Sequence, residues 1–375
     1  MAVKLLPYSL TLARPLETAR GTIEAREGFL VAIEREEILG IGEATPLPGW
    51  TESLETCELA LTRAIDTYQR ETTNADQRAA LDTLNAGETP AARHGLTAAL
   101  ADLGAREAGQ PLYRHLGGDR EVDRVPVNAT IGDGSPEEAE SAAASAVEEG
   151  FRCLKVKVGA RSIEADVARL RAIGEEVEEG DDIEIRADAN GAWSREEARR
   201  ALTAFEEVLG GRLAYVEQPL SASDLAGHAA LREGKGGDGG GSGGSSIGIA
   251  LDESLAEYAP ETVLETGAAD VLICKPMVLG GFDRVREIAL RARAAGVEPI
   301  VTTTIDGAIA RAGATHLAAS LAPIVPCGLA TASLLDSDLV GSDPAPITNG
   351  YIRVPQSLGT VETATTREAL DELTD

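Results

Sequence analysis

The 375-residue chain has no long apolar run, few cysteines and few lysines. Because a membrane-spanning helix needs about 20 consecutive apolar residues, we expect no segment to cross a membrane. The amino terminus also lacks the apolar core and cleavage site of a signal peptide, which predicts a cytoplasmic protein. Its four cysteines show no C-x-x-C spacing, which argues against a disulfide framework and against a zinc site.

Positive charge is scarce. The formal net charge is -28, and the acidic residues are spread along the whole chain rather than gathered in a tail. This balance argues against a nucleic-acid partner. Such a surface repels itself unless salt screens it, with a Debye length of about 3 Å at 1 M, so we expect a salt-loving source. Assembly into a homo-oligomer stays open.

Lysine is the rarer of the two basic residues. Only five of the 34 basic residues are lysines, and arginine supplies the rest. Arginine is permanently protonated, whereas a lysine that is desolvated or placed beside another cation can lose its proton and act as a base. Where lysine persists in such a chain, chemistry is a reason for it. The lysines are Lys4, Lys155, Lys157, Lys235 and Lys275.

The first 120 residues predict a small α+β unit. Three alternating runs suggest an antiparallel sheet, two helical patterns follow it, and the polar stretch between the helices predicts a loop at 71–90. The strands are expected at Lys4–Ala13, Gly28–Arg35 and Glu37–Ala44, and the helices at Ser53–Arg70 and Ala91–Ala108.

From about Arg124 onward, short apolar runs alternate with helical patterns. Eight strands, nearly all followed by a helix, favour an α/β fold with a closed parallel barrel. A doubly wound open sheet is the alternative, but no glycine-rich phosphate loop follows the first strand. The low-complexity stretch Gly234–Ser246, with Lys235, predicts a flexible loop at the bottom of the barrel. The strands are expected at Val125–Ile131, Cys153–Val158, Ile183–Asn190, Leu213–Pro219, Gly248–Glu253, Asp270–Pro276, Pro299–Thr303 and Ile324–Gly328.

Charged residues stand at the carboxyl ends of five successive predicted strands. Residues two apart in a strand share a face, so the two lysines of the second strand both point into the barrel, where each ammonium should depress the pKa of the other. The next three strands each end in an acid, and the sixth ends in a lysine. In chain order these residues are Lys155, Lys157, Asp188, Glu217, Asp252 and Lys275.

The three acids predict a metal site. Taken singly, each would be read as a helix cap or a surface charge, but three on adjacent strand ends converge on the barrel mouth. Clustered carboxylates are unfavourable without a cation, and an all-oxygen site suits Mg²⁺, with Mn²⁺ as an alternative ion. A proton next to a carboxylate is very weakly acidic, and a divalent cation offsets the charge that its removal creates. A desolvated lysine then serves as the base, so the sequence predicts a small-molecule carboxylate substrate.

Together, the strand-end motifs resemble the muconate-lactonizing subgroup of the enolase superfamily. The motifs are K-x-K at Lys155 and Lys157, D-A-N at Asp188–Asn190, V-E-Q-P at Val216–Pro219, D-E-S at Asp252–Ser254 and K-P at Lys275–Pro276. Within that subgroup, three further stretches are similar to the o-succinylbenzoate synthases: Gly42–Ser53, Thr302–Asp306 and Cys327–Leu335.

The resemblance implies a (β/α)7β-type TIM barrel with an α+β capping domain, and the loop Arg20–Gly28 as part of a lid. The capping domain would comprise residues 1–123 and the returning tail 343–375, with the barrel at 124–342. The resemblance also implies a dehydration that yields o-succinylbenzoate, in menaquinone biosynthesis. Lys157 would remove the α proton, Lys275 would stabilise the enediolate from the other face, and Lys155 would tune Lys157. Substrate contacts would come from Asn190, Thr303 and Gly49.

Other activities stay open at this point. A lysine on each face also suits a racemase or epimerase, and muconate cycloisomerase and N-acylamino acid racemase remain alternatives. The acidic pair expected of dipeptide epimerases after the eighth strand is missing from Cys327–Ala332. A non-catalytic barrel that binds acidic metabolites would require the ligands or the base to be lost, and none is.

Overall fold

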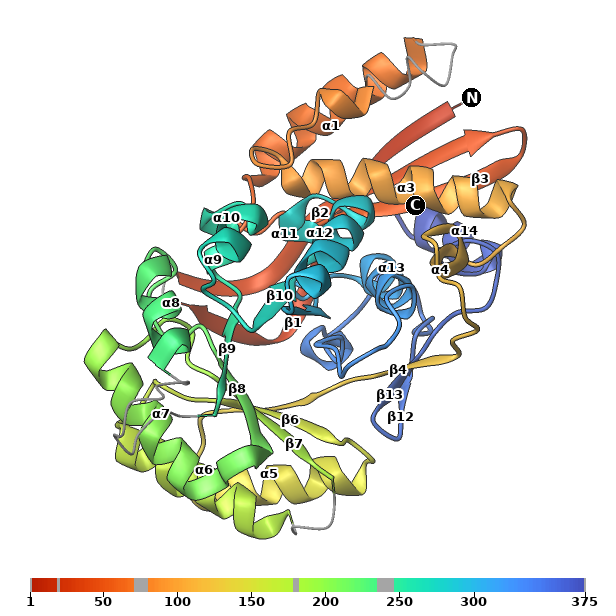
Figure 1. Cartoon of the computed structure of the whole chain (residues 1–375). Helices are drawn as coiled ribbons and strands as arrows, with labels where there is room; N and C mark the ends of the chain where they lie inside the picture. Colours follow the sequence, from red (N-terminus) through yellow and green to blue (C-terminus); the bar gives the residue numbers. More distant parts are fainter. Residues whose placement is uncertain (1, 19–20, 71–79, 178–181, 235–245, 374–375) are drawn as a thin grey trace.

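The structure is a computed structural model that describes residues 2–18, 21–70, 80–177, 182–234 and 246–373. A long-stranded sheet and two long helices from the N-terminal part lie beside a larger body of alternating strands and helices (Figure 1). No helix in these ranges is long and apolar enough to cross a membrane. The glycine-rich loop predicted around Lys235 falls almost entirely at 235–245, outside the described residues.

The N-terminal sheet is antiparallel, in the order β1-β2-β3. Alternation along β2 buries Phe29, Val31 and Ile33 in a cluster shared with the two long helices. The predicted strands and helices are confirmed, but residues 21–28 of the loop expected at Arg20–Gly28 are strand. Arg20 lies outside the described residues, and the lid role stays a prediction. Residues 80–82 are helical rather than loop, and 71–79 lie outside the described residues. The elements are β1 (Ala2–Thr18), β2 (Gly21–Arg35), β3 (Ile38–Ala44), α1 (Leu54–Arg70) and α3 (Pro90–Glu107).

Seven parallel strands form the curled sheet of the larger unit, in the order β11-β10-β9-β8-β7-β6-β5. Most apolar residues of these strands are buried on both faces, as a sheet covered by helices requires. The strands are β5 (Ala129–Ile131), β6 (Cys153–Lys157), β7 (Glu184–Asp188), β8 (Leu213–Glu217), β9 (Gly248–Leu251), β10 (Val271–Cys274) and β11 (Glu298–Val301).

Two residues take the place of the eighth predicted strand. Cys327 forms a parallel bridge with Val127 on one side, and Gly328 forms one with Thr302 on the other. The proline at 326, just before them, has no amide hydrogen and so cannot donate to a longer ladder. The predicted strand is therefore shortened, but the bridges join the two edges of the sheet and confirm the barrel.

The first predicted barrel strand, Val125–Ile131, is two strands in different sheets. β4 (Arg124–Pro126) pairs antiparallel with β13 (Tyr351–Arg353), whereas Val127 bridges to Cys327 and β5 pairs with β6 in the barrel. Pro126 lacks an amide hydrogen, so it cannot donate to a continuing ladder. The prediction of one continuous strand is wrong for this reason.

Helices follow most barrel strands and cover the outside of the sheet (Figure 1). The predicted capping box of α7 is confirmed: the Ser194 side chain accepts from the Glu197 amide, and the Glu197 side chain accepts from the Ser194 amide. The helices are α5 (Pro136–Glu148), α6 (Ile163–Glu176), α7 (Arg195–Leu209), α8 (Leu225–Glu233), α9 (Ser254–Glu257), α10 (Pro260–Glu265), α11 (Pro276–Leu279), α12 (Phe282–Ala294) and α13 (Ala308–Ala319).

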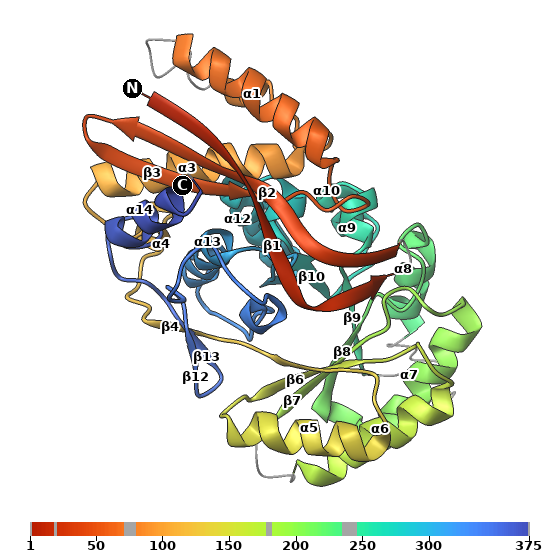
Figure 2. The same ribbon diagram turned by 180° about the vertical axis from the view of Figure 1, so that it is seen from behind.

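The C-terminal tail returns to the N-terminal unit (Figure 2). The Thr360 amide donates to Asp102 Oδ1 at 2.5 Å, and Arg106 Nη2 donates to the Val361 carbonyl at 2.7 Å. This agrees with the expected return, while the limits 1–123, 124–342 and 343–375 stay a prediction. The tail contains β12 (Ile347–Thr348), β13 (Tyr351–Arg353) and α14 (Thr363–Asp371), and the short helix α4 (Leu112–His115) precedes the barrel.

Buried polar side chains join the N-terminal sheet to the barrel. Glu43 of β3 accepts hydrogen bonds from the Gly307 amide at 2.7 Å and the Ala310 amide at 2.8 Å, at the start of α13. A carboxylate satisfies amides that have no partner within the helix. Arg26 of β2 donates to the Pro46 carbonyl at 3.2 Å and to the Ile305 carbonyl at 3.3 Å. Strands of one unit thus supply hydrogen bonds that a loop and a helix of the other unit need.

Candidate active site

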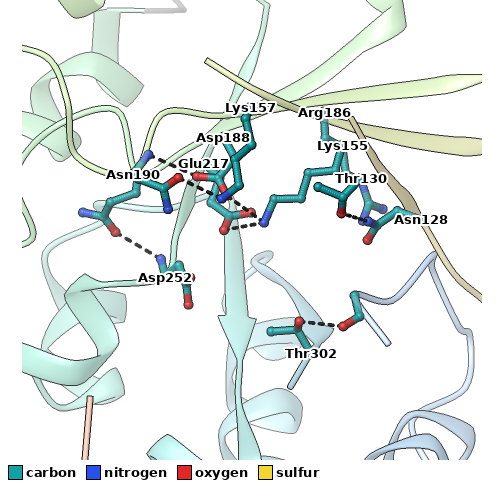
Figure 3. Close-up of polar contacts among 12 residues, drawn as sticks. Asn128, Thr130, Lys155, Lys157, Arg186, Asp188, Asn190, Glu217, Asp252 and Thr302 are labelled. Atoms are coloured by element: carbon teal, nitrogen blue, oxygen red, sulfur yellow. Dashed lines mark hydrogen bonds and ion pairs between the residues drawn. The ribbon is translucent and has the colours of Figure 1, made fainter. Parts of the chain in front are cut away.

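The six predicted strand-end residues lie together at the barrel mouth, and Figure 3 shows five of them (Lys155, Lys157, Asp188, Glu217 and Asp252). The strand register aligns them: Lys157 pairs with Asp188, and Asp188 pairs with Glu217. Asp252 directly follows β9, and Lys275 directly follows β10. Because parallel strands end at the same edge of a sheet, five consecutive strands bring their last charged residues to one place.

The lysines of β6 form ion pairs with the acids of β7 and β8. Lys155 Nζ lies 2.9 Å from Asp188 Oδ2 and 2.8 Å from Glu217 Oε1. Lys157 Nζ lies 2.8 Å from Asp188 Oδ2, and its side chain is 38% exposed against 19% for Lys155. Lys155 is therefore enclosed among carboxylates, whereas Lys157 reaches the open mouth of the barrel, where a substrate would lie.

Lys275 reaches the same site from β10. Its Nζ lies 2.6 Å from Asp252 Oδ2. The indole ring of Trp50 covers it, with the ring centroid 3.7 Å from Nζ, which is a cation–π contact. Trp50 belongs to the N-terminal unit, so the loop around it forms a wall of the site. The sequence pointed to this loop through Gly49 but did not assign the tryptophan a contact.

The pKa values of the site reflect burial and opposing charges. Burial lowers the pKa of Lys155, but Asp188 and Glu217 outweigh burial and hold that pKa well above its ordinary value. The expectation that the two ammonium groups depress each other's pKa is therefore wrong for Lys155, because the carboxylates lie closer to it than the sequence could show. Burial, followed by the charge of Asp188, raises the pKa of Glu217 to about 7. Burial also raises the pKa of Asp252 to about 6, against the effect of Lys275.

The acids have unsatisfied oxygens that a cation would satisfy. Among the described residues, no three His, Cys, Asp or Glu side chains form a ready group of metal ligands; the Lys155 ammonium instead lies between Asp188 and Glu217. Glu217 Oε2 and Asp252 Oδ1 are nevertheless buried and have no hydrogen-bond partner in the described structure. Buried carboxylate oxygens need a partner, and oxygen is the donor that Mg²⁺ prefers. The residues fit a divalent cation, and the full set of three ligands stays a prediction.

The three predicted substrate contacts differ in their surroundings. Asn190 lies in the site, where its Oδ1 accepts from Lys157 Nζ at 2.8 Å. Thr303 follows β11, and its hydroxyl lies 3.0 Å from that of Thr331. Gly49 immediately precedes Trp50 and has a φ of 97°, which glycine adopts without strain. Asn190 thus binds the predicted catalytic residue Lys157, and its role in binding substrate stays a prediction.

Two further residues of the site belong to the strand-end motifs, but the sequence did not assign them a role. Glu253, from D-E-S, accepts from Asn190 Nδ2 at 3.0 Å. Gln218, from V-E-Q-P, accepts from the amides of Asp252 at 3.1 Å and Ser254 at 3.2 Å. Each directly follows a predicted metal ligand in the sequence, which was the only signal of a role. Their contacts join separate strands, so they depend on how the strands align in the sheet.

Comparison with known proteins identifies relatives of both units. A family model described as "Enolase C-terminal domain-like" matches residues 137–362, and one described as "MenC, N-terminal domain" matches residues 1–103. The L-Ala-D/L-Glu epimerase of Bacillus subtilis (strain 168) is 31% identical over 319 residues, which cover 83% of this chain and 82% of the epimerase. The o-succinylbenzoate synthase of Enterobacter sp. (strain 638) is 29% identical over 320 residues, or 85% of this chain and 87% of the synthase.

Solved structures resemble nearly the whole chain. The substrate-liganded L-Ala-D/L-Glu epimerase from Bacillus subtilis has a TM-score of 0.81 at 28% identity, covering 96% of this chain and 98% of that one. The dipeptide epimerase from Enterococcus faecalis V583, complexed with Mg and the dipeptide L-Leu-L-Tyr, has a TM-score of 0.80 at 27% identity, with the same coverage.

Proposed function

Because the chain belongs to the enolase superfamily, we propose that it is a Mg²⁺-dependent o-succinylbenzoate synthase. This lyase would remove water from a 2-succinyl-6-hydroxy-cyclohexadiene-1-carboxylate. The superfamily includes lyases as well as epimerases and racemases, and relatives of this chain are found among both. The choice between them therefore depends on this chain's own residues.

The composition of the segment after the eighth strand position carries the proposal. Cys327–Ala332 reads C-G-L-A-T-A and contains no acid. Thr303 and Thr331 place neutral hydroxyl groups there. A dipeptide carries a free ammonium group, which needs a carboxylate partner when it is bound away from water. A neutral segment suits a ring and a succinyl chain without an ammonium group.

The reaction requires a base, an opposing cation and a leaving group. Lys157 Nζ, at the open mouth, would take the α proton of the substrate. Lys275, on the far side of the acids, would hold its ammonium beside the enediolate oxygens. Loss of hydroxide, which takes up a proton, then gives aromatic o-succinylbenzoate and water. Held by Asp188, Glu217 and Asp252, Mg²⁺ would offset the second negative charge on the substrate carboxylate.

Lys155 would act on the base rather than on the substrate. Its pKa lies well above the ordinary value, so its ammonium stays charged at neutral pH. It shares Asp188 with Lys157, since both Nζ atoms contact Oδ2 of that carboxylate. Through this shared carboxylate, Lys155 influences where the Lys157 ammonium lies. This supports the predicted tuning role of Lys155.

Racemisation or epimerisation of an N-acylamino acid is the second candidate. The observation that favours it is the placement of Lys157 on β6 and Lys275 beyond β10, on either side of the acids. One lysine could remove a proton from one face and the other could return it to the opposite face. An N-acylated substrate also lacks the free ammonium that the segment Cys327–Ala332 could not bind.

A direct assay separates the two candidates. In Mg²⁺ and molar KCl, we expect the purified enzyme to convert the cyclohexadiene substrate to o-succinylbenzoate. The reaction is monitored through the loss of diene absorbance. Muconate, dipeptides and N-acylamino acids serve as parallel substrates. Turnover of one of these without dehydration of the cyclohexadiene would reject the synthase proposal.

Removal of Mg²⁺ should abolish turnover, and added Mg²⁺ should restore it. Binding should also stabilise the fold, because a ligand at 100 times its Kd adds about 2.7 kcal/mol to the unfolding free energy. Thermal melting with EDTA and with Mg²⁺ measures this independently of activity. The variant Asp252→Asn removes one predicted ligand and should show a smaller rise. An equal rise in that variant would exclude Asp252 as a ligand.

Salt should be needed for both activity and stability. The chain carries a net charge of -28. Some helices contribute only acids to this charge: α5, with the sequence P-E-E-A-E-S-A-A-A-S-A-V-E, contains no basic residue, so its carboxylates repel one another. Screening of this repulsion predicts loss of activity below about 0.1 M salt, where the Debye length reaches about 10 Å, and recovery in molar KCl. A salt titration of kcat and of melting temperature tests it; a flat response would reject a salt-loving source.

A further inference from the structure

Glu253 and Lys157 are linked through the side-chain amide of Asn190. Glu253 Oε1 accepts from Asn190 Nδ2 at 3.0 Å, and Asn190 Oδ1 accepts from Lys157 Nζ at 2.8 Å. A side-chain amide has one accepting end and one donating end. Because the Glu253 carboxylate occupies the NH₂ end of the Asn190 side chain, the amide oxygen of Asn190 must face the Lys157 ammonium.

The backbone around this link is held in unusual conformations. Asn190 has a φ of 44° and Gln218 a φ of 42°, in the left-handed region. The backbone amide of Asn190 donates to Asp188 Oδ1 at 3.1 Å. Gln218 Oε1 accepts from the backbone amides of the residues on both sides of Glu253. Non-glycine residues keep such conformations only where their surroundings enforce them. The ends of β7, β8 and β9 thus form one frame that places Glu253 against Asn190.

We propose that Glu253 is a positioning residue for Lys157: it fixes the Asn190 amide so that the amide oxygen aims the Lys157 ammonium. The proposal rests on the proposed function, in which Lys157 is the base. The opposite lysine is held differently, since Lys275 contacts Asp252 and the ring of Trp50. Loss of Glu253 should therefore remove a hydrogen-bond partner of Lys157 through Asn190, while Lys275 keeps its contacts with Asp252 and Trp50.

Loss of the acceptor has a definite physical effect. Without Glu253, the Asn190 amide can rotate and turn its NH₂ group toward the Lys157 ammonium, where donor faces donor. Nζ then loses one of its two hydrogen-bond partners and keeps Asp188 alone. Displacement of a reacting group by about 1 Å is enough to cost about 100-fold in rate.

Three variants test the proposal. Glu253→Leu removes the acceptor at similar size, and Glu253→Gln keeps an acceptor oxygen but removes the charge. Glu257→Gln removes an exposed charge from α9, the short helix that Glu253 precedes. We expect E253L to lower kcat by about 100-fold while KM changes by less than about threefold. We expect E253Q to retain most of kcat, and E257Q to match the wild type.

The outcomes separate the possibilities. Equal losses in E253L and E253Q would show that charge matters rather than the accepted hydrogen bond, and would overturn the proposal. A change in KM alone would make Glu253 a substrate contact and would overturn it as well. Circular dichroism and melting establish that each variant is folded.

Crystal structures of E253L and the wild type provide a readout that needs no turnover. The proposal requires Lys157 Nζ to lose its contact with Asn190 in E253L, and a retained contact would overturn it. A wild type that dehydrates nothing would reject the synthase assignment, but the lysine contact would still decide whether Glu253 positions Lys157. The two failures are thereby distinguishable.

Discussion

Replacement of Lys157 by alanine is expected to lower kcat by about 10²- to 10⁴-fold, the range typical for loss of a general base. Lys157 carries the more exposed of the two β6 ammonium groups, and its two partners, Asp188 and Asn190, hold it at the barrel mouth. KM should change far less, because the proton is transferred only in the transition state. Steady-state dehydration of the cyclohexadiene substrate measures both constants.

The matched control is Lys4→Ala, which removes an exposed lysine from β1, away from the strand ends. It should keep wild-type kcat. Lys275→Ala is the informative companion, since it removes the ammonium under Trp50. If K157A kept its rate while K275A lost it, the base would be Lys275, and the roles of the two lysines would be exchanged.

The variant Glu217→Gln should lose roughly 10³-fold in kcat, since a catalytic metal supplies several kcal/mol of transition-state stabilisation. Glu217 is fully buried, with Asp188 and Asp252 at the ends of the neighbouring strands, and its Oε2 has no hydrogen-bond partner within the described structure. An amide is a poorer ligand for Mg²⁺ than a carboxylate. Activity measured across a Mg²⁺ titration should show that excess metal does not restore the wild-type rate.

The same variant should be more stable than the wild type in EDTA at pH 8. Burial and Asp188 raise the pKa of Glu217 from 4.5 to about 7. Ionising Glu217 therefore disfavours the folded state: this cost is absent below pH 4.5, grows as the pH rises from 4.5 to 7, and is constant above. At about 1.4 kcal/mol per pKa unit, E217Q should gain on the order of 1–3 kcal/mol at pH 8.

Urea unfolding at pH 4.5 and pH 8 measures this difference. The gain should be largely lost at pH 4.5, where Glu217 is protonated in the folded state and half protonated in the unfolded state. A variant that is less stable than the wild type at pH 8 would show that the ion pair with Lys155, at 2.8 Å, outweighs the cost of burying the carboxylate.

The sequence allowed the six strand-end residues to be placed because the placement follows from repetition. Each parallel strand ends at the same edge, so locating β7 and β8 was enough to bring Asp188 and Glu217 together. The electrostatics of Lys155 could not be predicted in the same way. Its pKa depends on the distances to two carboxylates of other strands, and these distances follow from side-chain conformation rather than from order along the chain.

The errors in the fold occur at prolines and at a pairing distant in sequence. Val125–Ile131 has the alternation of one strand, but Pro126 falls within it, and β4 pairs with β13 more than 200 residues later. Trp50 was missed for a related reason. Its contact with Lys275 crosses between the two units, and no local pattern records such a contact. Glu253 likewise acquires a partner only when β7 and β9 are both in place.

The hydrogen bonds of Glu43 and Arg26 between the two units have a consequence for unfolding. If the N-terminal sheet unfolded alone, the Gly307 and Ala310 amides would lose their acceptor. A hydrogen bond to a charged group contributes about 1.5–3 kcal/mol net. If the barrel unfolded alone, the buried Glu43 carboxyl would lose those donors in turn. Unfolding of either unit alone would forfeit these hydrogen bonds, so we expect heating to melt both units in one cooperative transition.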